Sequence, residues 1–107
     1  MVVHDGSMMP GFRPGDRLLV DPRPSRSPAA GDVVALKDPE APGRLLLKRV
    51  VRVEGSPPSR FWVEGDAATA SHDSRHFGWV DGPALVGLAW FRYAPEARRG
   101  RLVGSLK

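Results

Sequence analysis

The 107-residue sequence contains no cysteine. It therefore forms no disulfide and has neither a thiolate nucleophile nor a cysteine metal cage. No uncharged run approaches the roughly 18–20 residues that a membrane-spanning helix requires, and the run at 82–91 is far shorter. Residues 1–5 lack the apolar segment of a signal peptide. We therefore expect a cytoplasmic protein with no cofactor, although peripheral contact with a membrane stays open.

The amino-acid composition is typical of one small globular domain. Hydrophobic residues make up 41% of the chain and charged residues 26%. The net charge is +4, and basic residues gather near the end, at Arg92, Arg98, Arg99, Arg101 and Lys107. We interpret residues 1–95 as the folded domain and 96–107 as a solvated basic tail. The tail lacks interleaved aromatic residues, so no nucleic-acid partner is expected.

Turn signals divide the chain into short strands. The 12 glycines and 11 prolines separate runs of β-branched and aliphatic residues, which predict strands at 17–20, 32–36, 44–53, 61–64, 79–80 and 85–93. Residues 1–7 are expected to form a strand that enters a turn. The polar stretch 65–78 is expected to be a long functional loop. The fold class is therefore mostly β, built from short antiparallel strands.

Lys48 is a candidate general base because it lies within an apolar run of the predicted strand at 44–53. Leu46 and Val50 flank it on the same face of the predicted strand. Burial among apolar groups disfavours the ammonium form and lowers the pKa of a lysine, so that the amine can accept a proton. The alternative is an ordinary charged pair with Arg49 at a strand edge.

Ser7 is a candidate nucleophile on a stiffened turn. Gly6 allows a sharp turn before the serine, and Pro10 restricts Met9 to extended conformations. A serine hydroxyl attacks a carbonyl only when a base removes its proton, and Lys48 would supply that base. The alternative is a plain turn serine. Met8 is expected either in the core or, with Pro10, along a substrate groove.

Several short boxes follow one another in a diagnostic order: Ser7 to Pro10, Gly15 to Val20, Gly31 to Val34, Lys48 to Val51, and Gly65-Asp66 followed by Ser71 to Gly78. From about residue 6 to about residue 93, this order resembles the type I signal peptidase family (peptidase S26). The family comprises Ser/Lys-dyad serine proteases. Its mostly-β, LexA-like fold is shared with the self-cleaving repressor peptidases.

The resemblance implies roles for individual residues. Ser7 would be the nucleophile and Lys48 the base, with Ser71 orienting the amine. Asp73 and Arg75 would form a structural ion pair that braces the loop. The Ser7 backbone N–H would donate to the oxyanion, Arg49 would be structural, and no metal would be needed.

The sequence also departs from the family pattern. Gly11 replaces the usual Thr, and Ala67 stands where relatives usually carry Asn. Asp5 stands two residues before the serine, where a small residue or a serine is common. A carboxylate there would repel a developing oxyanion unless it points away.

The resemblance implies a serine endopeptidase that removes an N-terminal leader after a small residue. Its partner would be a leader-bearing polypeptide bound as an extended strand. The compact chain resembles the branch proposed to mature nickel-type superoxide dismutase, which suggests that precursor as substrate.

Two alternatives remain open from the residues alone. One is a Ser-His-Asp triad or a metal site that uses His4, His72 or His76 with Ser7 and Asp73; three plain surface histidines are the simpler interpretation. The other is a non-catalytic β-domain of the same fold that binds peptides or nucleic acid.

Overall fold

The computed structural model describes residues 1–67 and 72–102. Its strands are β1 (Arg17–Asp21), β2 (Val33–Lys37), β3 (Leu45–Glu54), β4 (Arg60–Glu64), β5 (Val80–Asp81), β6 (Leu85–Ala94) and β7 (Gly100–Arg101). The helical turns are α1 (Ser74–Phe77), η1 (Gly82–Ala84) and η2 (Glu96–Arg98). The strands form one antiparallel sheet in the order β1-β6-β2-β3-β4-β5, with β7 paired to β6. The predicted mostly-β fold is confirmed.

The strands end where the sequence predicts turns. Gly43 and Gly55 follow β2 and β3 with φ of 85° and 86°, a left-handed conformation that glycine adopts readily. β3 and β4 form the predicted antiparallel hairpin. Two details differ from expectation. Within the N-terminal segment, Val2 alone makes a bridge, to Arg17, and the predicted loop 65–78 contains the short helix α1.

β3 lies between two clusters of buried apolar side chains. The first core cluster consists of Val3, Met8, Phe12, Leu18, Val33, Leu47 and Ala89. The second core cluster consists of Val34, Leu36, Leu46, Val50, Phe61, Val63 and Val80. Because side chains alternate along a strand, β3 supplies Leu47 to the first cluster and Leu46 and Val50 to the second. Lys48 therefore falls in the same row as the second core cluster.

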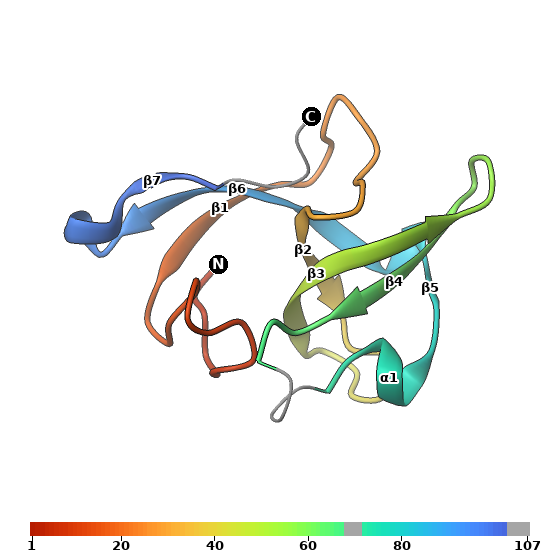
Figure 1. The fold of residues 1–107 in the computed structure, drawn as a ribbon, viewed down its shortest axis with the longest axis horizontal. Coiled ribbons are helices and arrows are strands. Elements are labelled where there is room, and N and C mark those ends of the chain that lie inside the picture. The colour runs from red at the N-terminus through yellow and green to blue at the C-terminus, as the bar shows by residue number, and fades with distance from the viewer. Residues whose placement is uncertain (68–71, 103–107) are drawn as a thin grey trace.

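β1 and β6 approach so closely at Gly87 that no larger residue fits there. A Cβ at Gly87 would lie 2.5 Å from the Asp21 carbonyl oxygen and 2.6 Å from a methyl group of Val20. Glycine within a strand often marks such a close approach of backbones. The absence of a side chain here lets β1 pair closely with β6. The N-terminal turn, which precedes β1, lies beside the segment after β4 (Figure 1).

Residues after 95 are partly folded onto the domain. Arg98 forms an ion pair with buried Asp16 at 2.7 Å, and Arg92 lies 3.5 Å from the same carboxylate. Both guanidinium groups also donate to the Gly11 carbonyl oxygen, at 2.9 and 3.0 Å. The expectation that these basic residues are solvated is wrong for Arg92 and Arg98, because a buried carboxylate recruits them.

Two features of the described residues bear on the sequence predictions. Within residues 1–67 and 72–102, no helix has the length and apolar character needed to cross a bilayer. Within the same ranges, no three histidine or acidic side chains are grouped so that they could hold a metal ion.

Candidate active site

Ser7 lies in a tight turn that is anchored to the core. The Met9 N–H donates to the Gly6 carbonyl at 3.1 Å, and the Phe12 N–H donates to the Met8 carbonyl at 3.0 Å. Met8 is 1% exposed and packs in the first core cluster. Of its two expected positions, Met8 therefore takes the core one, while Pro10 is exposed. With Met8 as its anchor, the turn holds Ser7 at only 3% exposure.

Lys48 lies in the middle of the sheet, paired through its backbone with Val34 of β2. Its side chain is 1% exposed and shares a strand face with Leu46 and Val50. Burial lowers the pKa of Lys48, and nearby positive charge on Arg44 adds to this effect. The carboxylates of Asp5 and Asp73 and the charge of Arg75 also act on the amine, the first two raising the pKa and the last lowering it.

The segment after β4 connects the serine turn to the lysine strand. The Ala67 N–H donates to the Ser7 carbonyl at 2.8 Å. Its neighbour Asp66 accepts two hydrogen bonds from the Arg49 guanidinium, each at 3.0 Å. Arg49 in turn follows Lys48 and donates to the Gly31 carbonyl at 2.7 Å. A short chain of contacts therefore runs from the Ser7 backbone to the residue next to Lys48.

The start of α1 covers the end of β4 beyond the two residues that pair with β5. The Asp73 carboxylate, 0% exposed, accepts the Gly65 N–H at 2.8 Å and caps α1 by accepting the Arg75 N–H at 3.0 Å. The Arg75 guanidinium pairs with the same carboxylate at 2.6 Å. The Ser74 hydroxyl oxygen accepts the Val63 N–H at 2.8 Å. Asp73 and Ser74 thus satisfy backbone donors that an unpaired strand edge would leave exposed.

Ser71, the residue expected to orient the lysine amine, lies outside the described residues. Asp73 and Arg75, which follow Ser71 closely in the sequence, form an ion pair with each other. The Arg49–Asp66 pair and the Ser74 contact with β4 were not predicted from the sequence. Both join residues that are distant in sequence, so their spacing carried no signal.

Asp5 contacts the candidate nucleophile directly. Its Oδ1 accepts the Ser7 backbone N–H at 2.9 Å. Burial would raise the pKa of Asp5, but it is outweighed by hydrogen bonds from the Ser7 backbone and side chain and by the positive charges of Lys48 and Arg44, so the pKa lies below its usual value. Asp5 is therefore a carboxylate at neutral pH. The Asp5 carboxylate points toward Ser7. It therefore does not point away from the site, which is the orientation that would avoid repulsion of an oxyanion.

The contacts of His72 and His76 differ from those of a Ser-His-Asp triad. His72 Nε2 lies 3.3 Å from Asp38 and 3.2 Å from Glu40, and its ring packs near that of His76, with 5.6 Å between the ring centroids. His4 is exposed at the surface. These contacts support the interpretation of the histidines as surface and loop residues.

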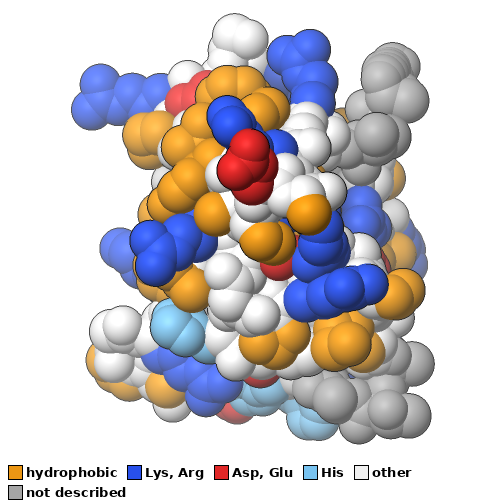
Figure 2. Space-filling view, turned by 90° about the vertical axis from the view of Figure 1, so that its left-hand side faces the viewer, with side chains coloured by type: hydrophobic (Ala, Val, Ile, Leu, Met, Phe, Trp, Pro, Cys, Tyr) orange, Lys and Arg blue, Asp and Glu red, His pale blue; other side chains and the backbone are white. Residues whose placement is uncertain are grey.

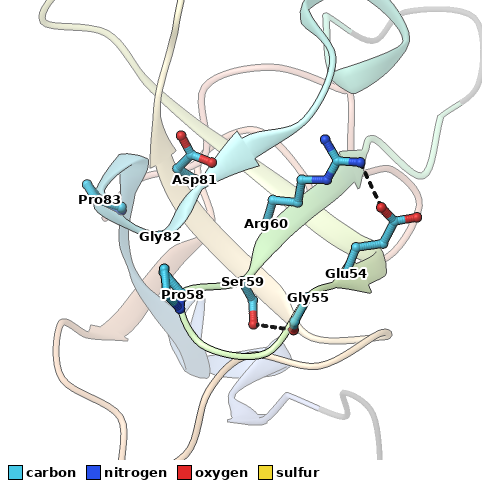
Figure 3. Close-up of a pocket in the computed structure, with 8 residues that line it drawn as sticks. All are labelled: Glu54, Gly55, Pro58, Ser59, Arg60, Asp81, Gly82 and Pro83. Carbon is cyan, nitrogen blue, oxygen red and sulfur yellow. Dashed lines mark hydrogen bonds and ion pairs between the residues drawn. The ribbon is translucent and has the colours of Figure 1, made fainter.

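A hollow of about 540 Å³ lies elsewhere on the molecule, between the β3–β4 turn and the β5–η1 segment (Figure 3). Arg60 and Glu54 pair across one side of it at 2.8 Å, and the Ser59 hydroxyl donates to the Gly55 carbonyl at 3.0 Å. None of the predicted site residues lines this hollow. The candidate site is therefore defined by the buried serine and lysine and not by the shape of this pocket.

Comparison with known proteins gives one consistent result. The family described as "Signal peptidase, peptidase S26" matches residues 1–57, a segment that holds both Ser7 and Lys48. The mitochondrial ATP-independent inner membrane protease subunit 1a of Arabidopsis thaliana is 32% identical over 94% of the chain and 73% of its own length. The mitochondrial inner membrane protease subunit 2 of Schizosaccharomyces pombe is 34% identical over 90% of the chain and 64% of its own length.

A bacterial relative adds to this comparison. The signal peptidase I of Bacillus caldolyticus is 40% identical over 56% of the chain and 33% of its own length. A small antiparallel β-domain that buries a serine and a lysine is consistent with a peptidase. The chain belongs to the signal peptidase family, peptidase S26. Its general function is that of a serine peptidase that removes leader peptides.

Proposed function

We propose that Ser7 and Lys48 form the catalytic dyad of a serine endopeptidase. The observation that carries this proposal is the burial of both side chains, at 3% and 1% exposure, in two segments joined through Ala67, Asp66 and Arg49. A lysine enclosed by aliphatic side chains exists more readily as a neutral amine than a solvated lysine does. A neutral amine is what a general base for serine requires.

The proposed reaction proceeds through an acyl-enzyme. The Lys48 amine takes the hydroxyl proton as Ser7 Oγ attacks the scissile carbonyl carbon, and a tetrahedral intermediate forms. When the C–N bond breaks, the Lys48 ammonium gives its proton to the leaving amine. Water then attacks the ester with Lys48 again as base, which releases the leader and restores Ser7. Ser71 remains the proposed partner that orients the amine, and Asp73 with Arg75 the proposed brace.

The open edge of β3 supports binding of the substrate as an added strand. Residues 45–47 pair with β2 on one side, and in the described part of the chain no strand pairs with them on the other. Leu45 is 48% exposed at this edge. An extended leader would hydrogen-bond there, and small side chains beside the cut would fit the confined space near Ser7. Pro10 at the exposed rim of the turn would contact the same peptide.

The proposed substrate is a precursor protein with a short N-terminal leader, such as that of a nickel-type superoxide dismutase. Relatives bear the names of mitochondrial inner membrane proteases, so the peripheral membrane contact left open by the sequence also stays a prediction. On the face shown in Figure 2, basic side chains are interspersed with apolar ones. This distribution offers no continuous basic stripe on that face for nucleic acid.

Mass spectrometry of cleavage products tests the proposal. Leader peptides and full precursors are incubated with the wild-type protein and with Ser7→Ala and Lys48→Met. We expect one cut after a small residue for the wild type and none for either variant. Matched controls are Ser56→Ala and Lys37→Met, which alter an exposed serine and an exposed lysine. Equal cleavage by Ser7→Ala, or no cleavage of any substrate by folded wild type, contradicts the proposal.

One observation favours a second candidate function, a peptide-binding domain without catalysis. The Asp5 carboxylate accepts the Ser7 N–H, the donor that acyl transfer would need for its oxyanion. A binding domain would retain leader peptides with the same affinity in the wild type and in Ser7→Ala and would release them uncut. Calorimetric titration followed by mass spectrometry of the recovered peptide separates the two functions.

A further inference from the structure

The Asp5 carboxylate occupies the place next to the Ser7 amide where a reacting carbonyl oxygen would bind. Asp5 Oδ1 lies 2.9 Å from the Ser7 nitrogen, which is the distance at which an oxyanion-hole donor holds its oxygen. The contact spans two residues, so the turn itself brings the carboxylate to this position. A negatively charged oxygen already on the donor resembles the oxygen of a tetrahedral intermediate in both charge and location.

We propose that Asp5 is an internal inhibitor of the dyad: its carboxylate fills the oxyanion site until the carbonyl of a bound leader displaces it. This inference rests on the proposed function, since it assigns Asp5 a role in the reaction of Ser7 and Lys48. Asp5 is exposed, so its side chain has room to turn outward into solvent when a peptide arrives. No bond forms or breaks in this step, which exchanges one hydrogen-bond acceptor for another.

The same carboxylate acts on the base. The groups whose charges reach Lys48 are Asp5, Asp73, Arg44 and Arg75. Asp73 is also paired with Arg75 through two hydrogen bonds, at 2.6 and 3.0 Å, whereas the Asp5 carboxylate is held by Ser7. The negative charge of Asp5 favours the ammonium form of Lys48. Asp5 therefore restrains the dyad twice, by covering the donor and by opposing the effect of burial that favours the neutral base.

A purely structural role for Asp5 makes the opposite predictions. Aspartate before a turn often accepts the N–H two residues on and so stabilises the turn. Asp21 does this at Arg23, also at 2.9 Å and away from the site. If Asp5 only braced the turn, Asp5→Ser would weaken the placement of Ser7 and reduce activity. Asp5→Asn would restore activity, because an amide oxygen accepts the same hydrogen bond.

The decisive experiment is the pH profile of kcat/KM on a cleaved leader peptide for wild type, Asp5→Ser, Asp5→Asn and the control Asp21→Asn. We expect Asp5→Ser to raise kcat/KM by about tenfold or more, given that one oxyanion donor is worth about 10²–10³ in rate. We expect the rising alkaline limb to move to lower pH in both Asp5 variants, since each removes a charge that favours the ammonium. Asp21→Asn should leave the profile unchanged. An Asp5→Ser protein that is equally or less active than the wild type overturns the proposal.

An NMR titration separates failure of this inference from failure of the proposed function. The Ser7 amide resonance should move as Asp5 titrates at acidic pH, and the side-chain resonances of Lys48 should titrate at lower pH in Asp5→Asn than in the wild type. If no variant cleaves any peptide, the proposed function fails even when both shifts are observed. If the peptide is cleaved but the Ser7 amide does not respond to Asp5, the inhibitory contact is contradicted and the dyad stands.

Discussion

The two buried charged side chains Asp16 and Lys48 have different surroundings. Asp16, 2% exposed, accepts the Arg13 N–H at 3.0 Å and the Arg98 guanidinium at 2.7 Å, with Arg92 at 3.5 Å. Lys48, 1% exposed, shares its strand face with aliphatic side chains, and charges of both signs act on its amine. Asp16 is surrounded by groups that stabilise its charge, whereas the surroundings of Lys48 disfavour its charge.

The different surroundings of Asp16 and Lys48 indicate two different roles for a buried charge, one in stability and one in chemistry. A buried charge that has its partners holds segments together, and its loss leaves those partners unsatisfied. A buried base whose charged form is disfavoured is ready to exchange a proton, at some expense of stability. Asp16 therefore belongs with the support of the fold, whereas the proposed function assigns Lys48 to the reaction. The two side chains predict opposite responses to mutation.

The largest expected effect is that of Lys48→Met on activity. Removing one member of a nucleophile–base unit costs several orders of magnitude in rate, so we expect kcat/KM to fall by more than about a thousandfold. Because methionine fills similar volume without a charge to desolvate, the free energy of unfolding should stay equal or rise by about 1 kcal/mol. Peptide cleavage assays and thermal unfolding measure the two quantities. A clear loss of stability in Lys48→Met would show that Lys48, like Asp16, mainly stabilises the fold, and it would contradict the difference between the two residues.

The next effect is that of Asp16→Ala on stability. This change removes the buried carboxylate that pairs with two arginines and accepts the Arg13 N–H, so we expect the free energy of unfolding to fall by about 2–4 kcal/mol. Asp81→Ala, at an exposed position, is the control and should change little. Urea unfolding followed by tryptophan fluorescence provides the measurement. An Asp16→Ala protein as stable as the control would show that the pairs with Arg92 and Arg98 contribute little.

The smallest effect is the pH dependence of stability that Lys48 contributes. Its pKa in the folded state lies below the reference value of 10.5, so between these two values the unfolded chain binds more protons. The free energy of unfolding therefore rises with pH in that window, by at most about 1.4 kcal/mol per pH unit for one group. The difference between wild type and Lys48→Met across alkaline pH isolates this contribution. A difference that stays flat up to pH 10.5 would contradict a lowered pKa.

The sequence predicted the strands well because their signals are local. Turn residues such as Gly43 and Gly55 fall where the chain reverses, and the alternation around Lys48 indicated its burial. The Asp5 contact with Ser7 was also within reach of local reasoning, since aspartate commonly accepts an N–H two residues on. From the sequence, we predicted only how the charge of Asp5 would act on an oxyanion.

Contacts between distant segments were beyond reach. Arg98 meets Asp16 across 82 residues, and Arg49 meets Asp66 across 17. Neither pair has a spacing that marks it, because the sheet order brings the partners together only after folding. For the same reason a basic run at the end of the chain looked like a solvated tail, although two of the basic side chains that were grouped with it meet a buried carboxylate.

The two arginine hydrogen bonds to the Gly11 carbonyl oxygen have a consequence for the order in which the fold forms during synthesis. Arg92 and Arg98 reach this oxygen from 81 and 87 residues further along the chain. Because synthesis runs from the N-terminus, a ribosome releases the serine turn before these two arginines. The turn thus receives this support only after the chain between the two contacts has been synthesised, so Ser7 emerges well before the side chains that brace its turn.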